Sequence, residues 1–338
     1  MLTRNITNFD RFTIDSIISL SQLNKFSYLY NFIFFKTLGY FPIFKKYCIR
    51  NKVKILHVHF GYHGIKSIGL KKCLNIPMVC SFYGNDVYKW PNQKKCCIKL
   101  QKLFKEAEQI LALGPYMKEH LIELGCSEQK ICIQHLGVSV DSIKYKPREY
   151  HDSEPLRFLI ASSFVEKKGI DIVLNALKFI EEDIDFKLDI IGDGHLKSYI
   201  LQLIRELKIE DRVKLHGYQP YSYFIDLAYQ CHIFLQASKT AANGDKEGTP
   251  MSLVDAMATG MPVISTYHSD IPEIVKDGEN GFLAEENNVE DFSNAILKIL
   301  NNIGDLEKFS QNARKHIEIS FNSKIQAMKL ESIYDKLN

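Results

Sequence analysis

The fold of this chain is indicated most clearly by Glu247-Gly-Thr-Pro-Met-Ser-Leu-Val-Asp-Ala-Met-Ala-Thr-Gly-Met-Pro-Val-Ile-Ser-Thr266. A glycine and a proline near its start predict a loop, after which Ser252 is placed to cap a helix over 253–259. Gly260 ends that helix, and the apolar run 263–266 predicts a short buried strand. The stretch therefore combines a turn, a helix start and a strand.

The start of this helix is a candidate phosphate site. Backbone N–H groups in the first turn of a helix have no partner within it and lie at the positive end of its dipole. We therefore expect an anion at the backbone of Gly248, Thr249, Met251, Ser252 and Leu253. Glu247 lies just upstream, where its carboxylate can accept hydrogen bonds from sugar hydroxyls. A phosphate site beside such an acid suggests a sugar nucleotide.

At these residues the chain resembles the retaining glycosyltransferases of family 4, which have the GT-B fold. The family places two acids eight positions apart before an Ala-Met-Ala-x-Gly-x-Pro-Val-Ile-x-Thr segment, and the acids are Glu247 and Asp255 in this chain. Other family landmarks match at 164–171, 191–194 and 211–217. The chain looks closest to the enzymes that build O-antigen and exopolysaccharide units of the colanic acid type. The alternative is a capped amphipathic helix in an unrelated α/β protein.

The resemblance implies an α/β fold of GT-B type, with two Rossmann-like domains that face a central cleft. We expect an acceptor-binding, membrane-facing domain over 1–149 and a nucleotide-sugar domain over 150–319. A last helix at about 320–338 is expected to pack back on the first domain. Residues 1–52 show no apolar strand and glycine loop of the kind with which family members open. The N-terminal domain is therefore expected to be reduced.

Alternating strands and helices predict a parallel sheet in each domain. Strands are expected at 53–60, 78–82, 109–113, 130–134, 157–161, 186–191, 213–217 and 233–238. Helices are expected at 93–106, 115–125, 169–177, 196–207 and through the last 35 residues.

The resemblance also implies a donor site and two catalytic residues, Glu247 and Lys168. Lys168 matches the family lysine that binds the donor diphosphate, and Ser163 stands where the family has an arginine. Glu247 is expected to bind the donor hexose, and Asp255 the ribose hydroxyls. The alternatives are a solvated helix start for Lys168 and a helix-stabilising role for Asp255. The remaining expected donor contacts are Gly61, Gly217 and Tyr218.

Three residues on one loop are candidates for the acceptor side: Tyr83, Asn85 and Asp86. Tyr83 occupies the place where many relatives have a histidine beside the reacting sugar, and a phenol is a poor base near neutral pH. A packing role for Tyr83 is the alternative. Further acceptor contacts are expected from the aromatic segment 28–47.

The charge of the chain is strongly segregated. Residues 1–105 contain 18 Lys or Arg and three Asp, a balance of +15, whereas the whole chain carries +3. This asymmetry predicts a polyanionic partner. Segment 28–47 is aromatic and basic but too interrupted to span a bilayer, so it favours an interfacial helix over the alternative of a core helix with a solvated basic edge. With eight cysteines in no C-x-x-C pair and no signal-peptide pattern, we expect a cytoplasmic protein at the inner face of the cytoplasmic membrane.

Taken together, these features predict a retaining transferase. It would move a hexose or N-acetylhexosamine from a UDP-sugar to a saccharide linked to polyprenyl diphosphate, with no cofactor and no metal. Nucleic acid is not an expected partner, because the basic half has no recognition helix or aromatic binding motif. The alternative function is a catalytically degenerate relative that acts as a scaffold or partner subunit, as departures at Tyr83, Ser163 and Asp255 allow.

Overall fold

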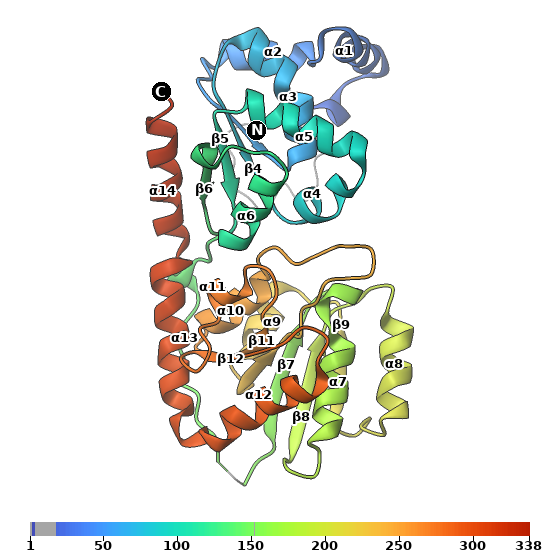
Figure 1. Cartoon of the computed structure of the whole chain (residues 1–338), viewed down its shortest axis with the longest axis vertical. Coiled ribbons are helices and arrows are strands. Elements are labelled where there is room, and N and C mark those ends of the chain that lie inside the picture. Colours follow the sequence, from blue (N-terminus) through green and yellow to red (C-terminus); the bar gives the residue numbers. More distant parts are fainter. Residues whose placement is uncertain (1, 4–17, 152) are drawn as a thin grey trace.

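The computed structural model describes residues 2–3, 18–151 and 153–338, which form two α/β domains stacked along the long axis of the molecule (Figure 1). The sheet of the N-terminal domain has the order β3-β4-β5-β6, with all neighbours parallel. Its strands are Leu56–His59 (β3), Met78–Ser81 (β4), Gln109–Ala112 (β5) and Ile131–Ile133 (β6). The helices of this domain are Lys25–Leu38 (α1), Pro42–Arg50 (α2), Gly61–Leu74 (α3), Asn85–Tyr88 (α4), Lys94–Glu106 (α5) and Pro115–Glu123 (α6).

The C-terminal domain has a six-stranded parallel sheet in the order β12-β11-β10-β7-β8-β9. Its strands are Leu156–Ala161 (β7), Phe186–Ile191 (β8), Val213–Gly217 (β9), Ile233–Leu235 (β10), Val263–Thr266 (β11) and Gly281–Ala284 (β12). Its helices are Ile170–Phe179 (α7), Lys197–Glu206 (α8), Tyr221–Ala228 (α9), Met251–Ala258 (α10), Ile271–Ile274 (α11), Val289–Asn301 (α12) and Leu306–Ser320 (α13). The strands predicted from the sequence all form, with shorter limits at several ends.

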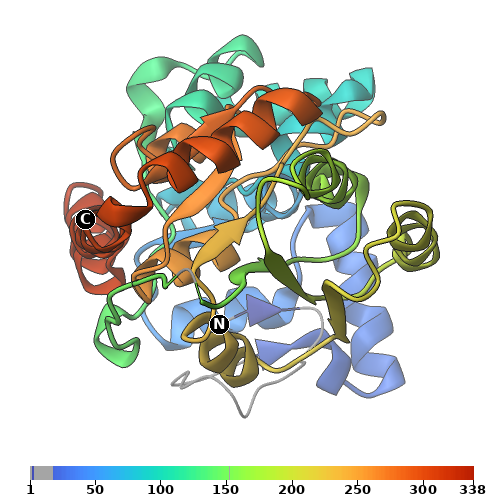
Figure 2. The same cartoon turned by 90° about the horizontal axis from the view of Figure 1, so that it is seen from below.

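Both faces of the C-terminal sheet are covered by helices, as the view from below shows (Figure 2). Phe158 and Phe292 belong to the apolar core on one face, and Phe234 and Met257 to the core on the other. Parallel strands buried on both sides need apolar side chains in both directions, which explains the mainly apolar composition of the central strands β7, β10 and β11. Helix α10, which carries the signature residues, is therefore fixed on the sheet by its buried face.

The C-terminal helices connect the two domains. Helix α13 lies beside the C-terminal domain, and Ser323–Asp335 (α14) continues along the N-terminal domain (Figure 1). The side-chain amide of Gln134 donates hydrogen bonds of 2.9 Å to the backbone and side-chain oxygens of Gln326 in α14. The hydroxyl of Tyr334, near the end of α14, contacts Nδ1 of His57 in β3. The final helix thus lies against the first domain, while the domain limit at 149/150 stays a prediction.

The first described residues of the chain form a short pair of strands. Leu2–Thr3 (β1) pairs in parallel with Ile18–Ser19 (β2). These two-residue strands are not the apolar strand and glycine loop with which family members open, so the expected reduction of this domain stays a prediction. Two residues are too few to show a period-two pattern, so such short strands cannot be predicted from periodicity. The expectation for residues 4–17 lies outside the described residues.

Segment 28–47 forms two helices rather than one. Gly39 ends α1 in a left-handed conformation with a φ of 77°, and α2 begins at Pro42. The buried side chain of Asn31 in α1 accepts a hydrogen bond of 2.9 Å from the backbone of Ile43, which fixes the two helices as a hairpin. Within the described residues, no helix is both long and apolar enough to cross a membrane.

Candidate active site

The signature loop lies where the two domains meet. A Cβ on Gly248 would collide with the backbone oxygen of Tyr83 in the N-terminal domain, so only glycine fits at this contact. On the other side, Gly84 has a φ of 139°, and a Cβ there would lie 3.4 Å from the nitrogen of Gly248. Two glycines from different domains therefore lie against each other where the domains meet.

Helix α10 presents a free N-terminus, but not in the way that the sequence predicted. The helix begins at Met251 after Pro250, with no side-chain cap, so Ser252 lies inside the first turn and is not its N-cap. The amide of Leu253 donates to the backbone oxygen of Pro250 at 3.0 Å, so its expected anion contact was also wrong. The early start follows from Pro250, whose fixed φ suits a position at a helix end. The amides of Met251 and Ser252 remain the phosphate candidates of this turn, next to Thr249.

The two predicted catalytic residues, 79 positions apart in sequence, are in direct contact. The ammonium group of Lys168, which follows β7 at the end of a short 3-10 turn, forms an ion pair with Oε2 of Glu247. Both side chains are largely buried. Burial alone would raise the pKa of Glu247, but Lys168, and behind it Lys167, bring that pKa below its ordinary value. Glu247 is therefore ionised at neutral pH and is compensated by the ammonium group of Lys168.

A residue that sequence reasoning missed, His268, fixes the backbone of Glu247. Its Nε2 accepts a hydrogen bond of 3.0 Å from the backbone N–H of Glu247. Its Nδ1 lies 2.6 Å from Oε1 of Glu286. The other carboxylate oxygen of Glu286, Oε2, accepts a hydrogen bond of 2.8 Å from the backbone N–H of Thr240. Burial lowers the pKa of His268, so the ring is neutral with its proton on Nδ1 toward Glu286. No motif was available to find this pair.

The residues expected to bind the nucleoside include Asp255, which lies beside Tyr221. Asp255 is buried in α10, and its Oδ1 accepts a hydrogen bond of 2.9 Å from the hydroxyl of Tyr221. Burial raises the pKa of Asp255 to about 6, with Tyr221 acting in the opposite direction. Gly217 ends β9 with open space around it, and Tyr218 is 81% exposed beside it. Tyr218 therefore offers an exposed aromatic ring three residues before Tyr221.

The turn after β7 contains two serines, Ser162 and Ser163, and Ser163 stands where the family has an arginine. Ser163 is exposed, and it carries no charge that could bind a phosphate. Within the described part of the chain, the buried Oγ of the preceding Ser162 has no hydrogen-bond partner. A buried hydroxyl without a partner is unfavourable, so a ligand that supplies one would be stabilised here.

On the acceptor side, the structure changes the role of Asp86. Its side chain is fully buried, and the carboxylate accepts hydrogen bonds from the backbone of Gly61 at 2.8 Å, Tyr83 at 3.0 Å and Gly84 at 3.1 Å. Asp86 therefore holds two cleft loops together and is not available to an acceptor. A Cβ at Gly61 would collide with the ring of Phe82, so packing alone requires glycine here, and the expected donor contact of Gly61 stays a prediction.

Tyr83 and Asn85 remain at the cleft. Asn85 is exposed at the start of α4, and the half-buried Tyr83 contacts Nδ1 of His59 through its hydroxyl. His57 and His59 lie on one face of β3 with stacked rings 4.5 Å apart, as expected from their spacing. Burial lowers the pKa of His59, so a neutral imidazole stands behind Tyr83. The expected contribution of segment 28–47 to this side was wrong, since α1 and α2 lie at the far end of the domain (Figure 1).

Asp270 forms a hydrogen-bonded contact between the domains. It precedes α11, and its carboxylate accepts from the backbone of Tyr116 at 2.7 Å and of Met117 at 3.3 Å, both in α6 of the other domain. Helix α6 has no side-chain cap of its own, because Gly114 stands at its N-cap. Burial raises the pKa of Asp270 to about 6, although the two backbone bonds oppose this. One domain therefore caps a helix of the other across the cleft.

Comparisons with known proteins agree with this architecture. The family model of Glycosyltransferase Family 4 matches residues 18–142, and that of Glycosyl transferases group 1 matches residues 141–316. Two parallel-sheet domains around such a site define a glycosyltransferase with the GT-B fold. The chain belongs to the group 1 glycosyl transferases, which confirms the resemblance seen in the signature residues.

Among curated relatives, the amylovoran biosynthesis glycosyltransferase AmsK of Erwinia amylovora is 32% identical over 84% of this chain and 70% of its own length. The putative colanic acid biosynthesis glycosyltransferase WcaL of Escherichia coli is 27% identical over 85% of this chain and 71% of its own. A crystal structure of a glycosyltransferase from Rickettsia africae has a TM-score of 0.78 at 21% identity, covering 95% of this chain and 84% of that one. HepE of Anabaena, solved with UDP and glucose, has a TM-score of 0.75 at 17% identity, covering 95% and 86%. These likenesses confirm the predicted fold.

Proposed function

We propose that this glycosyltransferase moves a hexose or N-acetylhexosamine from a UDP-sugar to a saccharide linked to polyprenyl diphosphate, with retention of the anomeric configuration. The product is a unit of an exopolysaccharide or O-antigen. Relatives named for amylovoran and colanic acid biosynthesis support this polymer class. The similar fold of HepE, solved with UDP, supports the choice of nucleotide.

The observation that carries the proposal is the buried pair of Lys168 and Glu247 beside the uncapped start of α10. An incoming diphosphate offers oxygens to Lys168, and the amides of Met251 and Ser252 stabilise the same anion at the positive end of the helix. The ammonium group of Lys168 then lies between the diphosphate and Glu247, and it keeps Glu247 ionised. The carboxylate of Glu247 accepts hydrogen bonds from the hydroxyls of the donor sugar.

The same arrangement supports a reaction without a protein nucleophile. As the bond from the anomeric carbon to the diphosphate breaks, Lys168 and the helix amides stabilise the negative charge on the departing oxygen. The carboxylate of Glu247 stabilises the positive charge that develops on the sugar. The acceptor hydroxyl attacks from the side of the leaving group, and its proton passes to the diphosphate oxygen. The proposed steps use no cofactor and no metal ion.

The nucleoside and the acceptor occupy opposite sides of these groups in the proposal. Asp255 accepts hydrogen bonds from the ribose hydroxyls, with Tyr218 available to stack on the base. The acceptor approaches from the loop of Tyr83 and Asn85. Because a phenol is a poor base, Tyr83 orients the acceptor hydroxyl and does not deprotonate it.

The enzyme is proposed to work at the inner face of the cytoplasmic membrane, where a polyprenyl-linked acceptor would be embedded. The excess of 15 positive charges in residues 1–105 supports attraction to an anionic surface.

A transfer assay tests the proposal. The purified protein is incubated with radiolabelled UDP-hexoses and UDP-N-acetylhexosamines and a panel of polyprenyl-diphosphate saccharides, and lipid-linked product is measured. One donor is expected to label the lipid fraction, and Glu247→Ala is expected to abolish labelling with the fold intact. Glu285→Ala, which changes an exposed acid of the same domain, is the matched control and retains activity. Near-normal transfer by Glu247→Ala would show that the carboxylate of Glu247 is not needed for the reaction.

A further inference from the structure

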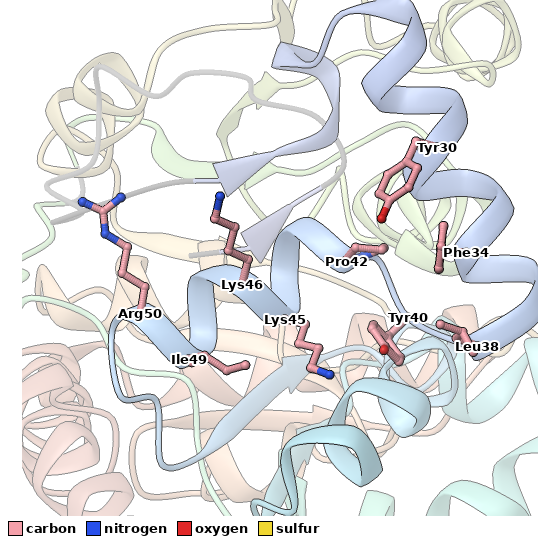
Figure 3. Close-up of a pocket in the computed structure, with 9 residues that line it drawn as sticks. All are labelled: Tyr30, Phe34, Leu38, Tyr40, Pro42, Lys45, Lys46, Ile49 and Arg50. Atoms are coloured by element: carbon pink, nitrogen blue, oxygen red, sulfur yellow. The ribbon is translucent and has the colours of Figure 1, made fainter.

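A groove separates α1 from α2 at the surface of the N-terminal domain (Figure 3). Its volume is about 560 Å³, within the range of roughly 300–1,000 Å³ that is usual for small-molecule sites. One wall carries Tyr30, Phe34 and Leu38, which are spaced by four residues along α1 and share one face of the helix. The other wall carries Ile49 of α2, with Tyr40 and Pro42 at the junction.

The helix hairpin around the groove exposes apolar side chains to solvent. Phe26 is 86% exposed, and Leu29, Tyr30, Ile33 and Ile49 are each more than half exposed. Isolated exposed apolar residues are common, but a cluster of this kind on one hairpin marks a surface that is covered in use. Aromatic residues with a polar end, such as Tyr30, are favoured at the boundary between lipid and water.

Cationic side chains of α2 line the groove, with Lys46 and Arg50 on one side of the helix and Lys45 on the other (Figure 3). Lys45, Lys46 and Arg50 line it from α2, and the ammonium group of Lys45 lies 5.6 Å from the centre of the Tyr40 ring. Residues 16–85 contain no Asp or Glu at all. Within the described part of the chain, Lys45, Lys46 and Arg50 form no ion pair with a carboxylate. The apolar groove therefore has a positive edge that no described acid neutralises.

The groove is separate from the reaction cleft. Helix α3 starts at Gly61 beside the cleft loops, and its Gly69 touches the backbone of Gly39 at the turn between α1 and α2. Eight residues of α-helix span about 12 Å, so this turn is already that far from the cleft end of α3. Figure 1 shows α1 and α2 at the end of the N-terminal domain that is farthest from the C-terminal domain. The groove and the loop of Tyr83 therefore lie on different parts of the N-terminal domain.

We propose that the groove between α1 and α2 is a binding site for an anionic phospholipid of the membrane, distinct from the acceptor site. One acyl chain lies in the groove against Phe34, Leu38 and Ile49. The phosphate lies at the edge formed by Lys46 and Arg50, and Lys45 adds positive charge from the other side of α2. The exposed face of α1 enters the headgroup region beside it. The inference rests on the proposed membrane association, but its test needs neither donor nor acceptor.

Vesicle binding of the full chain tests the site. Vesicles contain phosphatidylcholine alone or mixed with phosphatidylglycerol, and the bound fraction is measured by flotation. Each basic side chain near an anionic surface contributes roughly a factor of five in binding, so Lys45→Gln/Lys46→Gln/Arg50→Gln is expected to lose about 100-fold in affinity for the anionic vesicles. The control variant Lys94→Gln/Lys95→Gln/Lys99→Gln removes equal charge from exposed positions of α5 and is expected to lose much less.

The contact between the acyl chain and the groove is tested by photocrosslinking with phosphatidylglycerol that carries a diazirine in its acyl chain. Adducts are expected on Phe34, Leu38 or Ile49, and Leu38→Trp, which fills the groove, is expected to reduce them. Circular dichroism of each variant shows that the protein is folded. Equal losses in the two charge variants, or adducts confined to residues outside the groove, would overturn the proposal. Vesicle binding without any transfer activity would count against the proposed reaction alone.

Discussion

Replacing Lys168 with Met should destabilise the protein through the charge it leaves behind. Glu247 is 7% exposed, and its ion-pair partner in the structure is Lys168. Removing one member of a buried pair leaves an uncompensated charge and costs about 3–5 kcal/mol. For a domain of this size, we expect a fall in Tm of roughly 10 °C at pH 7.

Two features of this prediction separate it from a general loss of packing. Without Lys168, burial raises the pKa of Glu247, so the folded variant takes up a proton more readily than the unfolded chain. The destabilisation should therefore shrink as the pH is lowered from 7 toward 5. The double variant Lys168→Met/Glu247→Gln removes both charges and should recover most of the lost stability. It should still lack transferase activity.

The assay is thermal unfolding followed by circular dichroism at several pH values, with UDP binding measured in parallel. Lys178→Met is the matched control, because Lys178 pairs with Glu181 at a half-exposed position, where ion pairs contribute about 0–1 kcal/mol. The reasoning is refuted if Lys168→Met unfolds within about 2 °C of the wild type at pH 7, or if the double variant is no more stable than the single one.

Three further predictions concern residues around the site. Asp270→Ala removes the cap of α6 and should weaken the domain contact by about 1–2 kcal/mol, and Gly114→Ala should push the same carboxylate away. Small-angle scattering should show a larger radius of gyration for both, and an unchanged radius would mean that the contact contributes nothing. His268→Leu leaves the buried amide of Glu247 without its acceptor, which costs about 1–3 kcal/mol of stability. The variant should also bind UDP more weakly, and wild-type affinity would show that His268 is not needed to position Glu247. UDP affinity should fall as the pH drops through about 6, because Asp255 binds ribose as a carboxylate and has its pKa raised to about 6 by burial. Tyr221→Phe should move that midpoint upward, and a midpoint near 4 in the wild type would contradict the role of Asp255.

The sequence predicted those parts of the fold that depend on local pattern. The apolar runs that became β7, β8 and β11 lie in fully covered sheets, where burial on both faces requires them. Ser252 was misjudged because Pro250 can start the helix without a side-chain cap. The two-residue strand β1 is too short for any periodic signal.

The parts of the site that escaped prediction depend on contacts between distant residues. The family pattern marked Lys168 and Glu247 separately, but their ion pair brings together two loops that follow different strands. Asp86 has the residue type of a ligand-binding acid, and only its full burial among backbone amides shows its structural role. Asp270 reaches a helix 154 positions away in another domain, a contact with no local signal.

The central claim is that the cleft binds a uridine nucleotide at Lys168 and the start of α10. Its most direct test is a calorimetric titration of the purified protein with UDP, GDP and ADP, first without metal and then with magnesium. We predict saturable binding that is selective for UDP, needs no magnesium and is lost in Lys168→Met/Glu247→Gln. Absence of binding by all three nucleotides would contradict the account and would favour a scaffold or partner subunit with an empty donor site.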